Sequence, residues 1–214
     1  METKYLCSSW EGLIQEIVLL AGKGYYNYHI VKPNIKKLDR WPHIDNKLIK
    51  KYQTTLTKSQ RNTRKKKKQA TFRYLRWENI AVIMHTSGNI ADTITYDDKF
   101  FDIRRKPIKI IISELIEVSI YRESKKSFSL KLTDDSFENI KTLLSNAVSS
   151  GYKKNIISSF KLVNAIPPYK GIIRQKRKLV KFIAYSVKLH KLVFSTEILP
   201  FKDKRSSITV FEQD

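Results

Sequence analysis

The spacing of apolar residues predicts helices at both ends of the chain. From Ser8 to Ala21 the apolar side chains recur every three or four positions, and Ser8 or Ser9 is suited to cap that helix. Similar spacing predicts further helices over residues 45–52, 57–69, 136–148 and 154–165. The residues suited to cap the second and third of these are Thr57 or Ser59 and Thr133 or Asp134.

Strands are indicated where β-branched and aromatic residues cluster. Phe72–Trp77 and Ile80–Thr86 are typical of a hairpin, with Glu78 and Asn79 at its turn. Further strands are expected over residues 25–32, 93–96, 106–112, 116–121, 127–132 and 206–211.

The segment 171–190 fits either structure, because its β-branched residues suit strands while its apolar residues approximate a helical stripe. We expect a helix there, with one face formed by Ile173, Lys176, Val180, Ile183, Val187 and His190.

This order of elements predicts an α+β fold. We expect a mostly antiparallel central sheet with an N-terminal helix, a basic helix before the first hairpin, and C-terminal helices. The 214 residues suit a single compact unit over residues 1–214. The alternative is a basic N-terminal α/β part (1–90) and a β core with basic C-terminal helices (91–214).

Charge is segregated along this pattern. The chain has 42 Lys and Arg against 20 Asp and Glu, for a net charge of +22. Residues 46–77 contain no acid, and neither do residues 139–196, whereas the segment between them carries about as many acids as bases. A surface that is merely solubilising mixes both signs. The two acid-free stretches therefore favour a polyanionic partner.

We expect this partner to be RNA or DNA, gripped mainly through its phosphates. An anionic membrane attracts similar clusters, but the chain has no lipidation motif and no basic helix with a bulky apolar face. A second alternative is a basic subunit of a ribonucleoprotein assembly, with protein subunits as further partners.

The candidate contacts lie in three groups. The first group combines the basic helix with the strand that follows it. Alternation along this strand puts Phe72, Tyr74 and Arg76 on one face, which suits stacking on bases if it is exposed. The residues of the first group are Arg61, Arg64, Lys65, Lys66, Lys67, Lys68, Arg73, Tyr74 and Arg76. The second group is Arg174, Lys176, Arg177, Lys178 and Lys181. The third is Arg104, Arg105 and Lys106, which Asp102 and Glu114 could neutralise.

An enzymatic alternative is a metal-dependent nuclease, recombinase or replication initiator of a mobile element. Carboxylates near strands can hold Mg²⁺, and the candidates are Asp97, Asp98, Asp102 and Glu114. The histidines are scattered at His29, His43, His85 and His190, and the sequence has no zinc-ligand spacing and no phosphate-cradling glycine loop. We therefore expect a binding protein without a cofactor.

The single cysteine, Cys7, excludes an intrachain disulfide and is typical of a small buried apolar residue. No leader peptide and no apolar run long enough for a membrane span is visible. These features predict a soluble, intracellular protein, cytoplasmic or nucleoid-associated.

Overall fold

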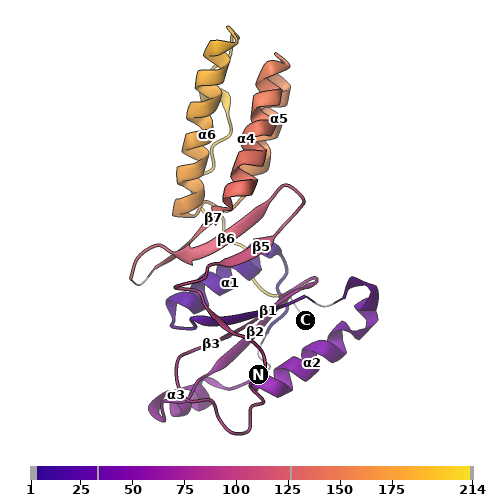
Figure 1. Cartoon of the computed structure of the whole chain (residues 1–214), viewed down its shortest axis with the longest axis vertical. Coiled ribbons are helices and arrows are strands. Elements are labelled where there is room, and N and C mark those ends of the chain that lie inside the picture. Colours follow the sequence, from indigo (N-terminus) through magenta and orange to yellow (C-terminus); the bar gives the residue numbers. More distant parts are fainter. Residues whose placement is uncertain (1–3, 33, 126, 213–214) are drawn as a thin grey trace. The chain divides into compact units, whose positions relative to one another are not determined.

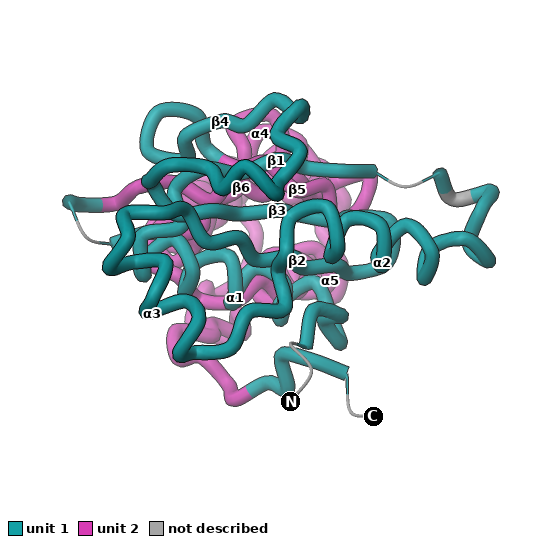
Figure 2. Tube along the Cα trace, turned by 90° about the horizontal axis from the view of Figure 1, so that it is seen from below, with its two compact units in different colours: residues 1–107, 124–128, 208–214 teal, residues 108–123, 129–207 magenta. Residues whose placement is uncertain are grey.

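The computed structural model describes residues 4–32, 34–125 and 127–212. The chain divides into two compact units, drawn in different colours in Figure 2. Unit 1 is residues 1–107, 124–128 and 208–214, and unit 2 is residues 108–123 and 129–207. The predicted α+β class is confirmed, with the strands in two antiparallel sheets. A single compact unit over residues 1–214 stays a prediction, as does the alternative boundary at residue 90.

Unit 1 contains a sheet with the strand order β2-β3-β1-β4. The predicted hairpin is confirmed: β2 and β3 pair antiparallel, with Tyr74 opposite Ile83, and Glu78 adopts the positive φ of 43° at the turn. β3 also pairs antiparallel with β1, so it is an internal strand of the sheet. The strands are β1 (Asn27–Val31), β2 (Phe72–Trp77), β3 (Ile80–His85) and β4 (Phe101–Asp102).

Two helices of unit 1 begin after residues that the sequence marks as caps. Ser9 accepts a hydrogen bond from Gly12 N–H at the start of the first helix, and Thr57 caps the third. The second helix begins at Trp41, four residues before its predicted start at Asp45, because Pro42 suits the first turn of a helix. The elements are α1 (Trp10–Gly22), the 3₁₀ helix η1 (Ile35–Arg40), α2 (Trp41–Tyr52) and α3 (Lys58–Lys66).

Helices α1 and α2 contact opposite faces of β2, since alternation directs neighbouring side chains to different sides. Arg73 faces Glu16 of α1, whereas Tyr74 and Arg76 face Asp45 of α2. Every residue of β3 is buried. In a strand that is covered on both faces, the side chains on both faces are apolar, which explains the run of Ile, Val and Met in β3.

Unit 2 combines a sheet of order β5-β6-β7 with a group of helices. Helix α4 packs against both α5 and α6, and the helices extend in the same direction away from the sheet (Figure 1). The ambiguous segment 171–190 is helical, as expected. The elements are β5 (Ile108–Ile111), β6 (Glu117–Arg122), β7 (Phe128–Leu132), α4 (Asp134–Ser149), α5 (Lys153–Asn164), α6 (Lys170–Leu189) and η2 (Thr196–Ile198).

The first turn of α6 is fixed to strand β7. A Cβ atom on Gly171 would lie 2.4 Å from the Leu130 oxygen, so only glycine allows this approach. Gly171 N–H donates to the Ser129 hydroxyl at 3.2 Å. The Gln175 side chain accepts from Leu132 N–H at 2.8 Å and donates to the Leu132 oxygen at 3.1 Å. These contacts set the rotation of α6 about its axis.

Two predicted strands are wrong. Residues 93–96 form no strand, because Ile94 packs into the apolar core while the side chain of Asp98 is held by Lys51 and Tyr52. Residues 206–211 form only an isolated antiparallel bridge, between Phe211 and Cys7. The prediction for Cys7 is confirmed: it is buried, and burial raises the pKa of its thiol to about 12.

Candidate nucleic-acid interface

Helix α3 presents a basic surface in unit 1. Thr57 and Gln60 form a capping box at its start, with hydrogen bonds of 2.8 and 3.2 Å. None of its residues is buried. The exposed lysines Lys65–Lys68 lie at its C-terminal end, where the helix dipole stabilises cations. These lysines make no ion pair with any residue that the structure describes.

The two arginines of α3 are engaged within unit 1. Arg61 donates to the backbone oxygen of Leu56, and Arg64 donates to the side-chain oxygen of Gln53. The Nη1 atom of Arg64 is buried, with no hydrogen-bond partner among the described residues. Of the predicted contacts on this helix, the lysines are therefore the ones available to a ligand.

The predicted exposed face of Phe72, Tyr74 and Arg76 is wrong, because α2 covers that side of β2. Tyr74 donates to one oxygen of Asp45 at 2.7 Å, and Arg76 Nε donates to the other at 2.9 Å. Asp45 is fully buried, and the Arg76 guanidinium lies 5.3 Å from the Trp41 ring. Tyr74 and Arg76 therefore stabilise the interior of unit 1.

Arg73, on the other face of β2, is largely enclosed. Its Nη2 atom lies 3.8 Å from Glu16 of α1, and its Nε atom has no hydrogen-bond partner within the described chain. Burial lowers the pKa of Arg73. Most of the Arg73 side chain is therefore shielded from solvent.

In the third predicted group, Arg104 is neutralised by the neighbouring acid Asp102. Arg104 forms a bidentate ion pair with Asp102, in which Arg104 Nη2 lies 2.6 Å from Asp102 Oδ2. This contact lowers the pKa of Asp102. The Arg104 guanidinium also lies 4.2 Å from the Tyr26 ring. Arg105 remains exposed beside them.

The longest basic surface is a stripe along α6 in unit 2. Six exposed residues of this 20-residue helix follow one another at intervals of three or four positions, so they lie on one face. The helix contains no acidic residue. We call this face the α6 stripe; it consists of Lys170, Arg174, Arg177, Lys181, Tyr185 and Lys188.

The stripe faces solvent because the other side of α6 is buried. Ile172, Leu179 and Ile183 are among the buried residues of that side. Within the stripe, Arg174 pairs with Glu123 at 2.6 Å. Hydrogen bonds from Tyr121 and then from Arg174 lower the pKa of Glu123. Among the described residues, the remaining four cations of the stripe form no ion pair.

The prediction that Lys176 contacts a ligand is wrong, because this side chain is fully buried. Its ammonium donates to the backbone oxygens of Asn164 at 3.2 Å, Ile166 at 3.1 Å and Lys202 at 3.4 Å. Lys176 therefore joins the end of α5 to the segment that follows η2. Its neighbours Arg177, Lys178 and Lys181 are exposed.

Lys176 should make the stability of unit 2 depend on pH. Burial, and secondarily the charge of Lys202, lower the pKa of Lys176 to about 8 from 10.5. Between these values the unfolded chain holds a proton that the folded chain has lost, so the unfolding free energy should rise with pH. A full shift corresponds to about 3 kcal/mol at most. Denaturant unfolding of the wild type and Lys176→Met from pH 7 to 10 measures it; a constant difference between the two would contradict it.

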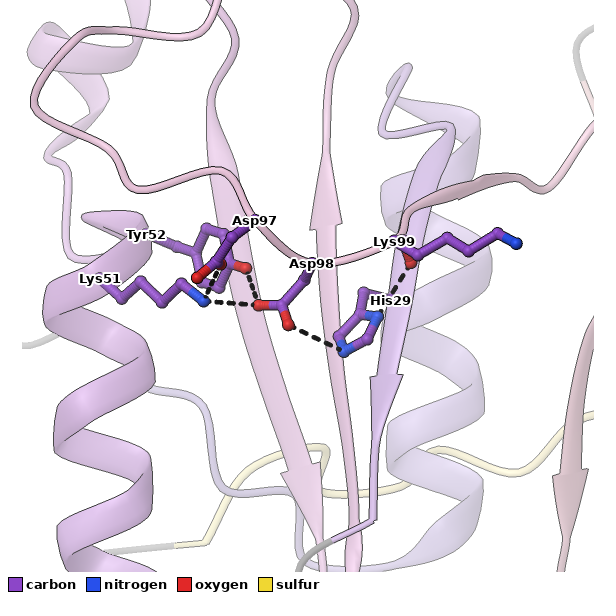
Figure 3. A network of polar contacts seen from close by, with 6 residues as sticks. All are labelled: His29, Lys51, Tyr52, Asp97, Asp98 and Lys99. Atoms are coloured by element: carbon purple, nitrogen blue, oxygen red, sulfur yellow. Dashed lines mark hydrogen bonds and ion pairs between the residues drawn. The ribbon is translucent and has the colours of Figure 1, made fainter.

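The acidic candidates Asp97 and Asp98 belong to a polar network that also includes His29, Lys51 and Tyr52 (Figure 3). Lys51 contacts both carboxylates, at 2.7 Å for Asp98, and Tyr52 donates to Asp98. The His29 Nε2 atom lies 3.8 Å from Asp98. The hydrogen bonds from Lys51 and Tyr52 lower the pKa of Asp98.

This network is a poor match to a Mg²⁺ site. The Lys51 ammonium contacts both carboxylates and offsets the negative charge that would attract the ion. Asp102 is paired with Arg104, and Glu114 is exposed in the turn after β5. Among the described residues, no three His, Cys, Asp or Glu side chains are grouped so that they could hold a metal.

Sequence reasoning did not group three exposed members of the α6 stripe with its basic cluster: Lys170, Tyr185 and Lys188. Their spacing of three and four positions from Arg174, Lys181 and each other was present in the sequence. It missed the network around Asp98 for another reason, since its members come from distant segments and no local pattern joins them.

Over the described residues, no helix combines the length and apolarity needed to cross a membrane. No protein-family model matches the chain, no curated protein is detectably similar to it, and no solved structure matches its fold.

Proposed function

We propose that this protein binds nucleic acid by contacting phosphates with exposed cationic side chains. The observation that carries the proposal is the α6 stripe: a solvent-facing row of five cations and one tyrosine on an acid-free helix. Like charges held in a row repel one another and destabilise a compact chain, and a polyanion relieves that repulsion.

The dimensions of the stripe suit an extended polyanion. A helix rises 1.5 Å per residue, so Lys170 and Lys188 are about 27 Å apart along the axis. Successive stripe residues are then about 5 Å apart. Long Lys and Arg side chains can follow a regular array of phosphates at this spacing.

The lysines at the end of α3 support the same function in unit 1. Lys65–Lys68 are exposed, and the acid-free stretch 46–77 that contains them parallels the stretch 139–196 that contains α6. Some other cations, including Lys51, Arg76 and Arg104, are instead paired with carboxylates. The lysines at the end of α3 and the α6 stripe thus gather exposed cations that, apart from Arg174, form no ion pair with any described residue.

A salt series of binding constants tests the proposal. Fluorescence anisotropy of the full chain with labelled 20-base-pair duplex DNA, duplex RNA and single strands should show log K falling steeply with log salt. On duplex DNA the slope is about 0.9 for each neutralised phosphate. With at least five contacts we expect a slope magnitude above about 4. A value below about 3, or no binding at low salt, would refute phosphate gripping by these surfaces.

The α3 lysines give a prediction of their own. Lys66→Gln with Lys67→Gln should weaken binding to every sequence alike and lower the slope on duplex DNA by about 2, because two phosphate contacts are lost. The matched control is Lys36→Gln with Lys37→Gln, which removes the same charge from exposed lysines of η1. An equal loss in both variants would mean that net charge, and not the α3 surface, drives binding.

A further inference from the structure

Tyr185 interrupts the cations of the α6 stripe with a large exposed ring. Its side chain is 68% exposed, and it lies four positions after Lys181 and three before Lys188. Because the helix rises 1.5 Å per residue, the two lysines lie about 6 and 4.5 Å from Tyr185 along the axis. An aromatic side chain is therefore bracketed by two cations without carboxylate partners, on one face.

This exposure is unusual within the chain. The other tyrosine rings pack on an aromatic or cationic neighbour or use their hydroxyl group; Tyr52 stacks on Phe72, Tyr96 stacks on Phe100, and Arg205 lies over Tyr169. Among the described residues, only Tyr185 and the 70% exposed Tyr152 lack such a contact. A solvent-facing ring without a neighbour adds little to the stability of the fold.

We infer that the α6 stripe binds a single-stranded nucleic acid, with one unpaired base stacked on Tyr185 and the flanking phosphates held by Lys181 and Lys188. This inference rests on the proposed function and narrows its ligand. Aromatic platforms combined with a cationic track are the usual means of holding single strands without sequence preference. A base can stack on a protein ring only when its own face is free.

The aromatic member of the stripe favours a single strand over a duplex. Arg and Lys contact the phosphates of either form and can also pair with guanine in a duplex groove, so the cations of the stripe do not distinguish the two. In a duplex the bases are stacked on one another, so the Tyr185 ring would contribute nothing.

The experiment measures binding of the full chain to a labelled 20-nucleotide oligouridylate, the matching oligothymidylate and a 20-base-pair duplex. Tyr185→Ala should weaken binding to the single strands by about 5- to 150-fold, the loss of one base stack. Tyr185→Phe should restore most of it, since the ring is kept. Duplex affinity and the salt slope should stay unchanged for both. The two single strands distinguish RNA from DNA as the preferred ligand.

Tyr152→Ala is the matched control, because Tyr152 has the same exposure in the same unit, beside Lys153 and Lys154, but outside the stripe. It should bind like the wild type. Three results would each overturn the inference, while steep salt dependence would leave phosphate binding intact. They are unchanged single-strand affinity in Tyr185→Ala, an equal loss of affinity for the duplex, and an equal loss in Tyr152→Ala. Absence of salt-dependent binding to any probe would instead remove the proposed function itself. A melting curve of each variant confirms that it is folded.

Discussion

Replacing Asp45 with alanine is expected to lower the free energy of unfolding of unit 1 by about 3–5 kcal/mol. Asp45 is fully buried and accepts hydrogen bonds from Tyr74 at 2.7 Å and from Arg76 at 2.9 Å. Without it, the guanidinium of Arg76 would stay buried with no anion, and removing one partner of such a pair costs far more than the pair contributes. Denaturant unfolding monitored by circular dichroism measures the loss.

Two further variants separate this cause from a general effect of mutation. Asp39→Ala removes an exposed carboxylate of the same unit and should change stability by less than about 0.5 kcal/mol. Asp45→Leu combined with Arg76→Met replaces both charges by apolar groups and should recover much of the stability. If the double variant is as unstable as Asp45→Ala, the buried charge of Arg76 is not the source of the loss.

Neutralising the α6 stripe should produce the largest change in binding. Lys170→Gln, Arg177→Gln, Lys181→Gln and Lys188→Gln together remove four of the proposed phosphate contacts. The slope of log K against log salt on duplex DNA should then fall by about 3 to 4, and affinity at 0.1 M salt by about a thousandfold. Arg174 is left in place because it holds Glu123. Anisotropy titrations between 0.05 and about 0.5 M salt measure both quantities.

The control removes four positive charges from unit 2 outside the stripe. Its positions are the exposed lysines Lys109, Lys161, Lys202 and Lys204, each replaced by glutamine. If phosphates follow the stripe, this variant should keep most of the affinity and most of the slope. Equal losses in the two variants would show that the ligand senses net charge alone.

Local patterns were sufficient for most of the fold. Alternation located β2 and β3, and the caps Ser9, Thr57 and Thr133 located the starts of α1, α3 and α4. Residues 93–96 have the composition of a strand, yet their neighbour Asp98 is held by side chains of α2, more than forty positions earlier in the chain. Such a tertiary contact overrides propensity, and no window of sequence contains it.

The candidate contacts were less predictable, because charge does not reveal exposure. The sequence pattern puts Lys176 on the apolar side of a helix, although its charge also made it a predicted ligand contact. Lys176 can be buried because its ammonium donates to the backbone oxygens of Asn164 and Ile166, which come close to it only in the folded chain. Tyr74 and Arg76 share a face of β2, as alternation predicted. Which face is covered depends on α2, and the strand's own sequence does not contain that information.

The glutamine that fixes α6 has a consequence for self-association. β7 is an edge strand of its sheet, and a free edge is a template for pairing with a second chain. The Gln175 amide occupies both the N–H and the oxygen of Leu132, and Gly171 lies against the Leu130 oxygen. The helix that carries the stripe therefore also blocks this edge against aggregation. Under the proposed function this protection matters, because cations neutralised by a polyanion no longer keep copies of the protein apart.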